Sequence, residues 1–276
     1  MHRTTLENSV ADVPVVPDEV DRLVGGGDHL HVPLPTRELV RLPGVVDERL
    51  AGTDDGRDLH SDPELSVVVP GANEGAVGNA SRLRILIGGE HSVSNAAFRA
   101  HAAHADEITV VQLDAHADLR QDDSDYHDRP WGPYAHCSVM RRAHDLGYRL
   151  VQVGVRAYSA EERELFGDPR ITVFEWGRRT PSVEEVVDAI PTERIYLTLD
   201  VDGLDPACMP ATGTPVPGGL DWYYTMNLLA AVTRSRRLVG ADVVEVCPRV
   251  GDSRTEYAAA QIVYSLLGLT SRPRLP

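Results

Sequence analysis

Hydrophobic and polar positions follow a regular pattern from residue 82 to the end of the chain. Short runs rich in β-branched and aliphatic residues, which are typical of buried strands, alternate with longer segments that have helical spacing. The runs are residues 84–87, 108–113, 150–155, 171–174, 195–199 and 242–246. Strands that alternate with helices predict an α/β fold, in which helices cover both faces of a mainly parallel sheet.

The segments between the runs carry helix signals. We expect helices near residues 94–104, 138–146, 222–235 and 255–267. Two pairs, Ser159 with Glu162 and Ser182 with Glu185, fit the capping box Ser-x-x-Glu, in which each side chain accepts a hydrogen bond from the other residue's backbone N–H. Both pairs therefore predict the start of a further helix.

The first 80 residues show little sustained periodicity, because Val and Leu are scattered there among many Asp, Gly and Pro residues. No strand or helix is assigned in this region. The stretch Gly25-Gly26-Gly27-Asp28-His29 follows no clear strand and is interpreted as a loop. We therefore divide the chain into an N-terminal region, residues 1–80, and an α/β domain, residues 81–276.

Composition narrows the classes of partner. The 276 residues carry a formal net charge of −15, which disfavours nucleic acid because phosphate binding requires basic patches. The acidity suits solubility or a cationic small molecule. We expect no membrane segment, since no apolar run approaches the roughly 18 residues needed. Cys137, Cys208 and Cys247 form no disulfide framework or zinc pair, so we expect a cytoplasmic protein.

Residues that can carry chemistry follow four of the predicted strands. In parallel α/β sheets, ligands bind outside the carboxyl ends of the strands. The stretches at these ends are Gly88-Gly89-Glu90-His91-Ser92, Asp114-Ala115-His116-Ala117-Asp118, Asp200-Val201-Asp202-Gly203 and Glu245-Val246-Cys247-Pro248. We predict that they present carboxylate and imidazole groups to one edge of the sheet.

Two imidazoles and four carboxylates in these stretches are candidate metal ligands: His91, Asp114, His116, Asp118, Asp200 and Asp202. A single Asp-x-Asp after a strand commonly forms a turn or a cap, but four clustered carboxylates repel one another unless cations neutralise them. Six ligands are too many for one tetrahedral zinc ion and suit two divalent ions bridged by carboxylates. The lack of thiolate ligands favours manganese.

Together these motifs resemble the ureohydrolase family, which comprises arginase, agmatinase and their relatives. Order and spacing agree from about residue 82 to the end, including residues 213–220 and 242–248. The resemblance implies a three-layer α/β/α sandwich that holds two Mn²⁺ ions, with two bridging carboxylates and one histidine and one further carboxylate for each ion. The bridges would be Asp114 and Asp200, and the remaining pairs His91 with Asp118 and His116 with Asp202.

The resemblance also implies a reaction. A hydroxide between the two ions would attack the carbon of a guanidinium group, and Glu245 would bind and orient that group. His136 stands just before a predicted helix and matches a family histidine that would carry a proton to the departing amine. Imidazole suits this role because it titrates near neutral pH. His127, on the same loop, is the alternative.

The loop after the Asp-x-His-x-Asp motif bears on the substrate. Residues 121–129 are acidic and lack the Ser/Asn-rich stretch with which arginases hold a carboxylate. Because acidic groups attract an ammonium and repel a carboxylate, the loop favours agmatine, which would give putrescine and urea. Guanidinobutyrase, formiminoglutamase and arginase activities stay open. From the resemblance alone we also expect a homo-oligomer.

Three other classes of function are considered. A family member that binds metal without turnover is favoured by residues 1–80, which lack the Gly-rich segment and the Gly-Pro-x-x-Ile-Arg-like helix usual in the family; His136 and Glu245 argue against it. A deacetylase of similar architecture would hold one metal, which the six ligands disfavour. A structural protein without a site would not explain why six ligands converge.

Overall fold

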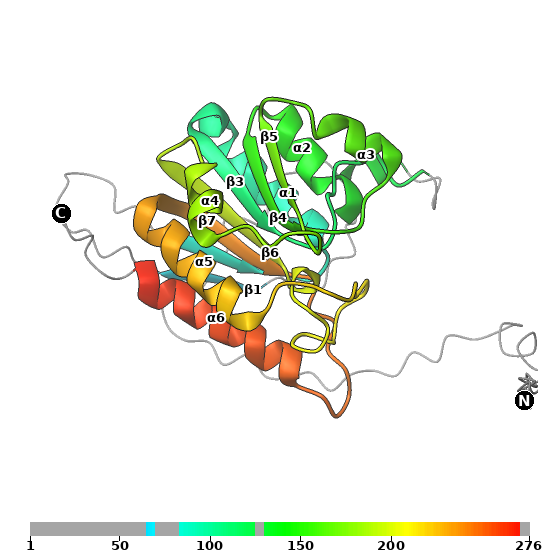
Figure 1. Cartoon of the computed structure of the whole chain (residues 1–276), viewed down its shortest axis with the longest axis vertical. Helices are drawn as coiled ribbons and strands as arrows, with labels where there is room; N and C mark the ends of the chain where they lie inside the picture. Colours follow the sequence, from blue (N-terminus) through cyan, green and yellow to red (C-terminus); the bar gives the residue numbers. More distant parts are fainter. Residues whose placement is uncertain (1–64, 70–82, 125–129, 271–276) are drawn as a thin grey trace, which may run out of the picture. The chain divides into compact units, whose positions relative to one another are not determined.

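A seven-stranded sheet forms the centre of the structure (Figure 1). The structure is a computed structural model that describes residues 65–69, 83–124 and 130–270, all within one compact unit. Its strands are β1 (Leu65–Val69), β2 (Leu83–Ile87), β3 (Ile108–Leu113), β4 (Arg149–Val155), β5 (Ile171–Glu175), β6 (Arg194–Asp200) and β7 (Arg237–Val244). The order across the sheet is β1-β2-β7-β6-β3-β4-β5. β1 is antiparallel to β2, and the remaining pairs are parallel.

Six α-helices belong to the described part of the chain. They are α1 (Ser94–His101), α2 (Val139–Asp145), α3 (Ala160–Leu165), α4 (Val183–Asp188), α5 (Trp222–Ser235) and α6 (Arg254–Thr270). The two predicted capping boxes are confirmed: Ser159 and Ser182 accept hydrogen bonds from the backbone N–H groups of Glu162 and Glu185 at the starts of α3 and α4. Among the described residues, no helix has the length and apolar character needed to cross a bilayer.

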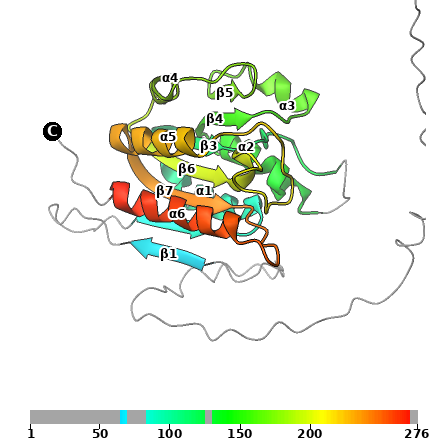
Figure 2. The ribbon, with the colours of Figure 1, turned by 60° about the horizontal axis from the view of Figure 1, so that its bottom comes forward.

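Hydrophobic side chains form one cluster on each face of the sheet. Phe98 of α1 and Met140 of α2 pack against one face, whereas Leu228 of α5 and Ile262 of α6 pack against the other. Side chains of successive strand residues point to opposite faces, and most buried strand residues are apolar because both faces are covered. Figures 1 and 2 show α4, α5 and α6 together on one side of the sheet. The three-layer α/β/α sandwich is therefore confirmed.

Three of the differences from the sequence prediction have a clear physical cause. The pattern did not indicate β1, an edge strand whose pairing with β2 is a long-range contact. β7 begins at Arg237, five residues before the predicted start, because Arg237 and Gly240 interrupt the apolar pattern. The helical signal near 94–104 divides into α1 and a 3-10 segment, Ala102–Glu107. His29, His127 and most of region 1–80 lie outside the described residues.

The strand order decides where the candidate ligands meet. β2, β7, β6 and β3 are consecutive neighbours in the sheet, and they are the four strands that the chemistry-bearing stretches follow. Because these strands are parallel, their carboxyl ends lie at the same edge. Residues separated by more than 150 positions in the chain, such as His91 and Glu245, are thereby brought into contact.

Candidate metal centre

His91 lies at the middle of a buried group of carboxylates. Its Nδ1 atom is 3.0 Å from Asp118 Oδ2, 3.3 Å from Asp114 Oδ2 and 3.5 Å from Asp200 Oδ2. The side chains of His91 and Asp114 are fully buried. Three carboxylate oxygens thus surround one imidazole nitrogen, and the side chains of Asp118 and Asp200 are only 6% and 5% exposed.

A second group shares Asp114 with the first. His116 Nδ1 lies 3.1 Å from Asp202 Oδ2 and 3.6 Å from Asp114 Oδ1. The two sets with the compactness of a metal site are His91 with Asp114 and Asp118, and Asp114 with His116 and Asp202. The structure therefore brings together all six residues that the sequence proposed as ligands, and the two sets meet at Asp114.

Hydrogen bonding fixes which nitrogen of His91 can bind a cation. The Thr198 hydroxyl lies 2.6 Å from Asp242 Oδ1, to which it donates, and 2.8 Å from His91 Nε2. Since the hydroxyl proton is used on Asp242, the Nε2–H group of His91 donates to Thr198. In the neutral ring the lone pair of Nδ1 then faces the carboxylates, of which Asp118 Oδ2 is the nearest at 3.0 Å. A cation between Nδ1 and the carboxylates fits this arrangement.

The raised pKa values of Asp118 and His116 show that the cluster favours bound positive charge. Burial and the charge of Asp114 raise the pKa of Asp118 to about 7. Burial lowers the pKa of His116, but hydrogen bonds to Asp114 and Asp202 outweigh it and raise this pKa to about 11. Without metal, the carboxylates are thus neutralised by protons, which divalent ions would displace.

Polar residues inside the strands support the ligands. Gln112 of β3 donates from Nε2 to Asp114 Oδ2 at 2.7 Å, and Gln152 of β4 donates to Gln112 Oε1 and, at 2.6 Å, to the carbonyl of Ala117. Asp242 of β7 is fully buried and also accepts hydrogen bonds from the hydroxyls of Ser94 and Tyr196. Sequence reasoning missed these partners. Their signal was a polar residue within an otherwise apolar strand.

Backbone geometry also adapts to the cluster. A Cβ atom on Gly203 would lie 2.7 Å from the backbone nitrogen of Asp114, and one on Gly154 would lie 2.8 Å from the Asp114 carbonyl oxygen. Two glycines therefore allow neighbouring segments to approach the shared ligand. Asp118 (φ 53°) and Glu245 (φ 64°) are the non-glycine residues with positive φ among those described, and such strain concentrates at functional sites.

Glu245 and His136 lie outside the two ligand sets. Glu245 Oε1 accepts a hydrogen bond of 2.6 Å from the His91 backbone N–H. Burial and the nearby Glu90 raise the pKa of Glu245, while the His91 hydrogen bond acts in the opposite direction. His136 opens a 3-10 turn, His136–Ser138, directly before α2, and its side chain is 54% exposed. Its Nδ1 lies 2.8 Å from Glu90 Oε1, a partner that sequence reasoning did not single out.

The acidic loop is described only in part. Asp122 is half-buried and accepts a hydrogen bond of 3.0 Å from the Ser124 backbone N–H, whereas Asp123 is 5% exposed. Asp125, His127 and Asp128 lie outside the described residues. All three cysteines are free thiols.

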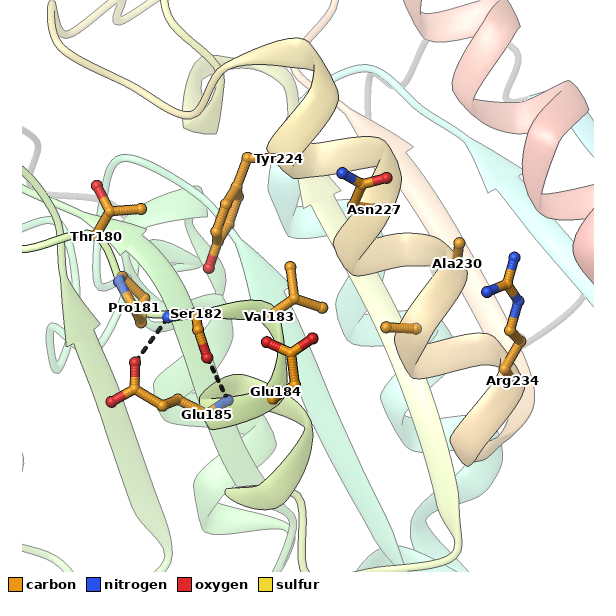
Figure 3. Close-up of a pocket in the computed structure, with 11 residues that line it drawn as sticks. Thr180, Pro181, Ser182, Val183, Glu184, Glu185, Tyr224, Asn227, Ala230 and Arg234 are labelled. Atoms are coloured by element: carbon orange, nitrogen blue, oxygen red, sulfur yellow. Dashed lines mark hydrogen bonds between the residues drawn. The ribbon is translucent and has the colours of Figure 1, made fainter.

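A groove elsewhere on the molecule is distinct from this centre. Figure 3 shows it between α4 and α5, with Ser182, Tyr224 and Arg234 among its lining residues. Its volume is about 660 Å³. None of the six candidate ligands lines it.

The comparisons with known proteins agree on one family. The sequence model of the Arginase family matches residues 55–268. The N(1)-aminopropylagmatine ureohydrolase of Synechocystis sp. is 36% identical over 190 residues, which cover 67% of this chain and 60% of the relative. The agmatinase of Pyrococcus horikoshii is 32% identical over 198 residues, which cover 70% of this chain and 65% of the relative.

Solved structures give the same picture. The agmatine ureohydrolase of Thermoplasma volcanium is 30% identical with a TM-score of 0.57, over 67% of this chain and 61% of that one. The proclavaminate amidino hydrolase of Streptomyces clavuligerus is 31% identical with a TM-score of 0.56, over 68% and 64%. The matched part of the chain spans 60% to 65% of the length of the two curated relatives. The resemblance seen in the motifs is confirmed: the chain belongs to the Arginase family.

Proposed function

We propose that this protein is a binuclear metal hydrolase that cleaves a guanidino C–N bond, with agmatine as substrate and putrescine and urea as products. The observation that carries the proposal is the pair of buried His/Asp sets that share Asp114. The family membership supports the reaction class, because relatives are named agmatinase and ureohydrolase.

The six ligands would hold the two ions, Mn²⁺ by the character of their donors. When bound, such ions lower the pKa of water to supply a nucleophile at neutral pH and stabilise charge in the transition state. The residues of the chain set the number and place of the ions. Asp114 and Asp200 would bridge, His91 and Asp118 would complete one site, and His116 and Asp202 the other.

Glu245 would orient the substrate. A guanidinium group is a planar cation with N–H donors on its edges, and a carboxylate is the acceptor that suits it best. The bond from His91 N–H fixes Oε1 of Glu245 beside the ligand set. A guanidinium bound there would have its carbon held near the ions, and productive orientation lowers the barrier.

His136 would supply the proton that the leaving group needs. In the reaction a C–O bond forms at the guanidino carbon and the bond from that carbon to the alkyl nitrogen breaks. This nitrogen leaves as an amine only if it receives a proton. The imidazole of His136 stands at the rim of the centre, where the negative charges of Asp118 and Glu245 act on it.

A second substrate is N(1)-aminopropylagmatine. The observation that favours it is the 36% identity to the relatives of Synechocystis sp. and Thermus thermophilus that are named for this substrate, against 32% to the agmatinase of Pyrococcus horikoshii. A third relative named for this substrate, from Thermococcus kodakarensis, is 32% identical. Both molecules are linear cations without a carboxylate. Both suit the acidic loop that follows Asp118 in the chain, as well as the net charge of −15.

The test is urea release by the Mn²⁺-loaded full chain from agmatine, N(1)-aminopropylagmatine, arginine and 4-guanidinobutyrate. We expect urea from one or both of the first two and at least ten times less from the carboxylate-bearing pair. Preference for arginine would overturn the substrate assignment, and no urea from any of them would overturn the proposed function.

Two further expectations belong to this proposal. Residues 81–276 would form the catalytic domain, because every candidate ligand lies within them, and the family resemblance implies a cytoplasmic homo-oligomer. Light scattering of the purified chain would test the oligomer, for which a mass above the 30.2 kDa monomer is expected.

A further inference from the structure

Glu90 joins two loops at the rim of the metal centre. Its Oε1 atom accepts two hydrogen bonds from one residue, from the backbone N–H of His136 at 2.8 Å and from its ring Nδ1 at 2.8 Å. Its Oε2 atom accepts from the Ser92 backbone N–H at 3.2 Å and from the Ser92 hydroxyl. The carboxylate therefore caps the turn that begins with His91 and, at the same time, holds the loop of His136.

The two bonds to His136 fix the ring chemically as well as spatially. A carboxylate only accepts, so Nδ1 must carry the hydrogen that points at Glu90. In the neutral ring, Nε2 then carries the lone pair, and in the charged ring Nε2 carries the transferable proton. The bond from the backbone N–H holds Glu90 Oε1 in place beside His136. Rotation of the ring away from Glu90 would therefore break the bond to Nδ1.

The next turn anchors the same loop to a candidate ligand. The backbone N–H groups of Met140 and Arg141, in the first turn of α2, donate to the carbonyl oxygen of Asp118 at 3.0 and 3.1 Å. His136 is thus attached to the metal centre from two sides, through Glu90 to the segment of His91 and through α2 to Asp118. Such a double attachment is expected for a group that must meet a reacting atom.

We propose that Glu90 is a positioning residue, which holds His136 in one orientation and one tautomer so that Nε2 is the nitrogen that exchanges a proton with the leaving amine. The part that concerns the amine rests on the proposed function. The part that concerns orientation and tautomer does not, and it is measurable without turnover.

Charge supports this role. The hydrogen bond to Glu90 raises the pKa of His136, burial opposes it, and the charges of Glu90, Asp118 and Glu245 add to the rise. These three carboxylates face the ring from the segments after β2, β3 and β7. A higher pKa keeps more imidazolium at neutral pH, which a proton donor to an amine requires.

The competing explanation is that Glu90 serves only as a cap for the turn of His91. The chain offers a matched control, because Ser92→Ala removes a partner of Oε2 and leaves both bonds to His136 in place. Glu90→Gln keeps the size of the side chain and an acceptor oxygen but removes the charge, whereas Glu90→Ala removes both.

The first readout is the nitrogen-15 NMR spectrum of the histidine rings in the full chain loaded with Zn²⁺, a diamagnetic ion, with His136→Asn to assign the signal. We expect the wild-type ring to carry hydrogen on Nδ1 and to titrate above the usual range. In Glu90→Gln the midpoint falls, in Glu90→Ala the tautomers mix, and in Ser92→Ala neither changes. Unchanged tautomer and midpoint in both Glu90 variants would overturn the proposal.

The second readout is the pH profile of urea release with Mn²⁺. We expect kcat to fall roughly tenfold in Glu90→Ala with KM changed less than threefold, and the basic limb of Glu90→Gln to move to lower pH together with the NMR midpoint. If Ser92→Ala lost as much kcat as Glu90→Ala, the result would support the competing explanation that Glu90 only caps the turn of His91. If the wild type released no urea, the proposed function would fail, while the NMR result would still decide the orientation of His136.

Discussion

The buried ligand cluster and the rim around His136 are held by different means. In the cluster, His91 and Asp114 are fully buried, and partners on β3, β6 and β7 fix the ligands through strand register. At the rim, His136 and Glu90 are about half exposed, and loop hydrogen bonds hold them. The sheet fixes where the ions would bind, whereas a few loop contacts hold the residue that we propose as proton donor. Changes in the cluster should therefore remove metal, and changes at the rim should slow turnover with metal in place.

The largest effect is expected for Asp114→Asn. The carboxylate is shared by both ligand sets, so its neutralisation weakens the binding of both ions. We expect fewer than one ion per chain and at least a 10³-fold loss of activity, which corresponds to about 4 kcal/mol of transition-state stabilisation. Metal analysis after gel filtration and a urea assay measure this. Asp145→Asn, at a carboxylate whose side chain is 48% exposed, is the control. Full activity in Asp114→Asn would remove Asp114 as a bridge.

His136→Asn should separate the rim from the cluster. Loss of the imidazole removes the proposed proton donor, and general acid catalysis contributes about 10²-fold or more. We expect kcat to fall by roughly that factor while metal content stays at the wild-type level. An unchanged kcat would transfer the role to His127 or to water, and a loss of metal would erase the distinction between the two regions.

Thr198→Val tests the support behind a ligand. The substitution keeps the shape of the side chain but breaks the link between Asp242 and His91 Nε2. Loss of such a partner costs roughly 10- to 100-fold in metal affinity. We expect this loss at the site that contains His91 and not at the site that contains His116. Thr198→Ser keeps the hydroxyl and should restore the affinity. Equal affinities in Thr198→Val and the wild type would show that the hydroxyl does not orient the ligand.

The smallest effect is a pH dependence of stability. The pKa of Asp118, raised to about 7 from 3.8, makes the metal-free chain lose stability as pH rises through about 7, and His116, raised to about 11 from 6.5, acts in the same direction. The lowered pKa of Asp114 stabilises the folded chain above the ordinary pKa of an aspartate. This contribution is therefore the same at the two pH values compared. We therefore expect Mn²⁺ to raise Tm more at pH 8 than at pH 6 in thermal scans. A shift independent of pH would contradict this charge balance.

The sequence predicted the elements and residues that depend on local pattern. β3, β6 and the two capping boxes were predicted from apolar runs and short motifs. Asp114 directly follows β3, and Asp200 is the last residue of β6, so both ligands were predicted from the ends of these runs. Because parallel strands end at one edge, the meeting of the ligands was predictable without coordinates.

What the sequence did not reveal depends on contacts between distant segments. β1 is formed through its pairing with β2. The contact of Glu90 with His136 arises because two loops from distant parts of the chain lie side by side. Thr198 supports His91 from 107 positions away. No local pattern encodes such pairs, so the arrangement around the ligands needed the structure.

The most direct test of the account is a calorimetric titration of the metal-free full chain with Mn²⁺, which counts the ions that bind. We predict two ions per chain in the wild type, with protons released on binding because the carboxylates exchange protons for metal. One ion per chain would favour a single-metal enzyme of similar architecture, and none would contradict the assignment of His91, Asp114, His116, Asp118, Asp200 and Asp202 as ligands.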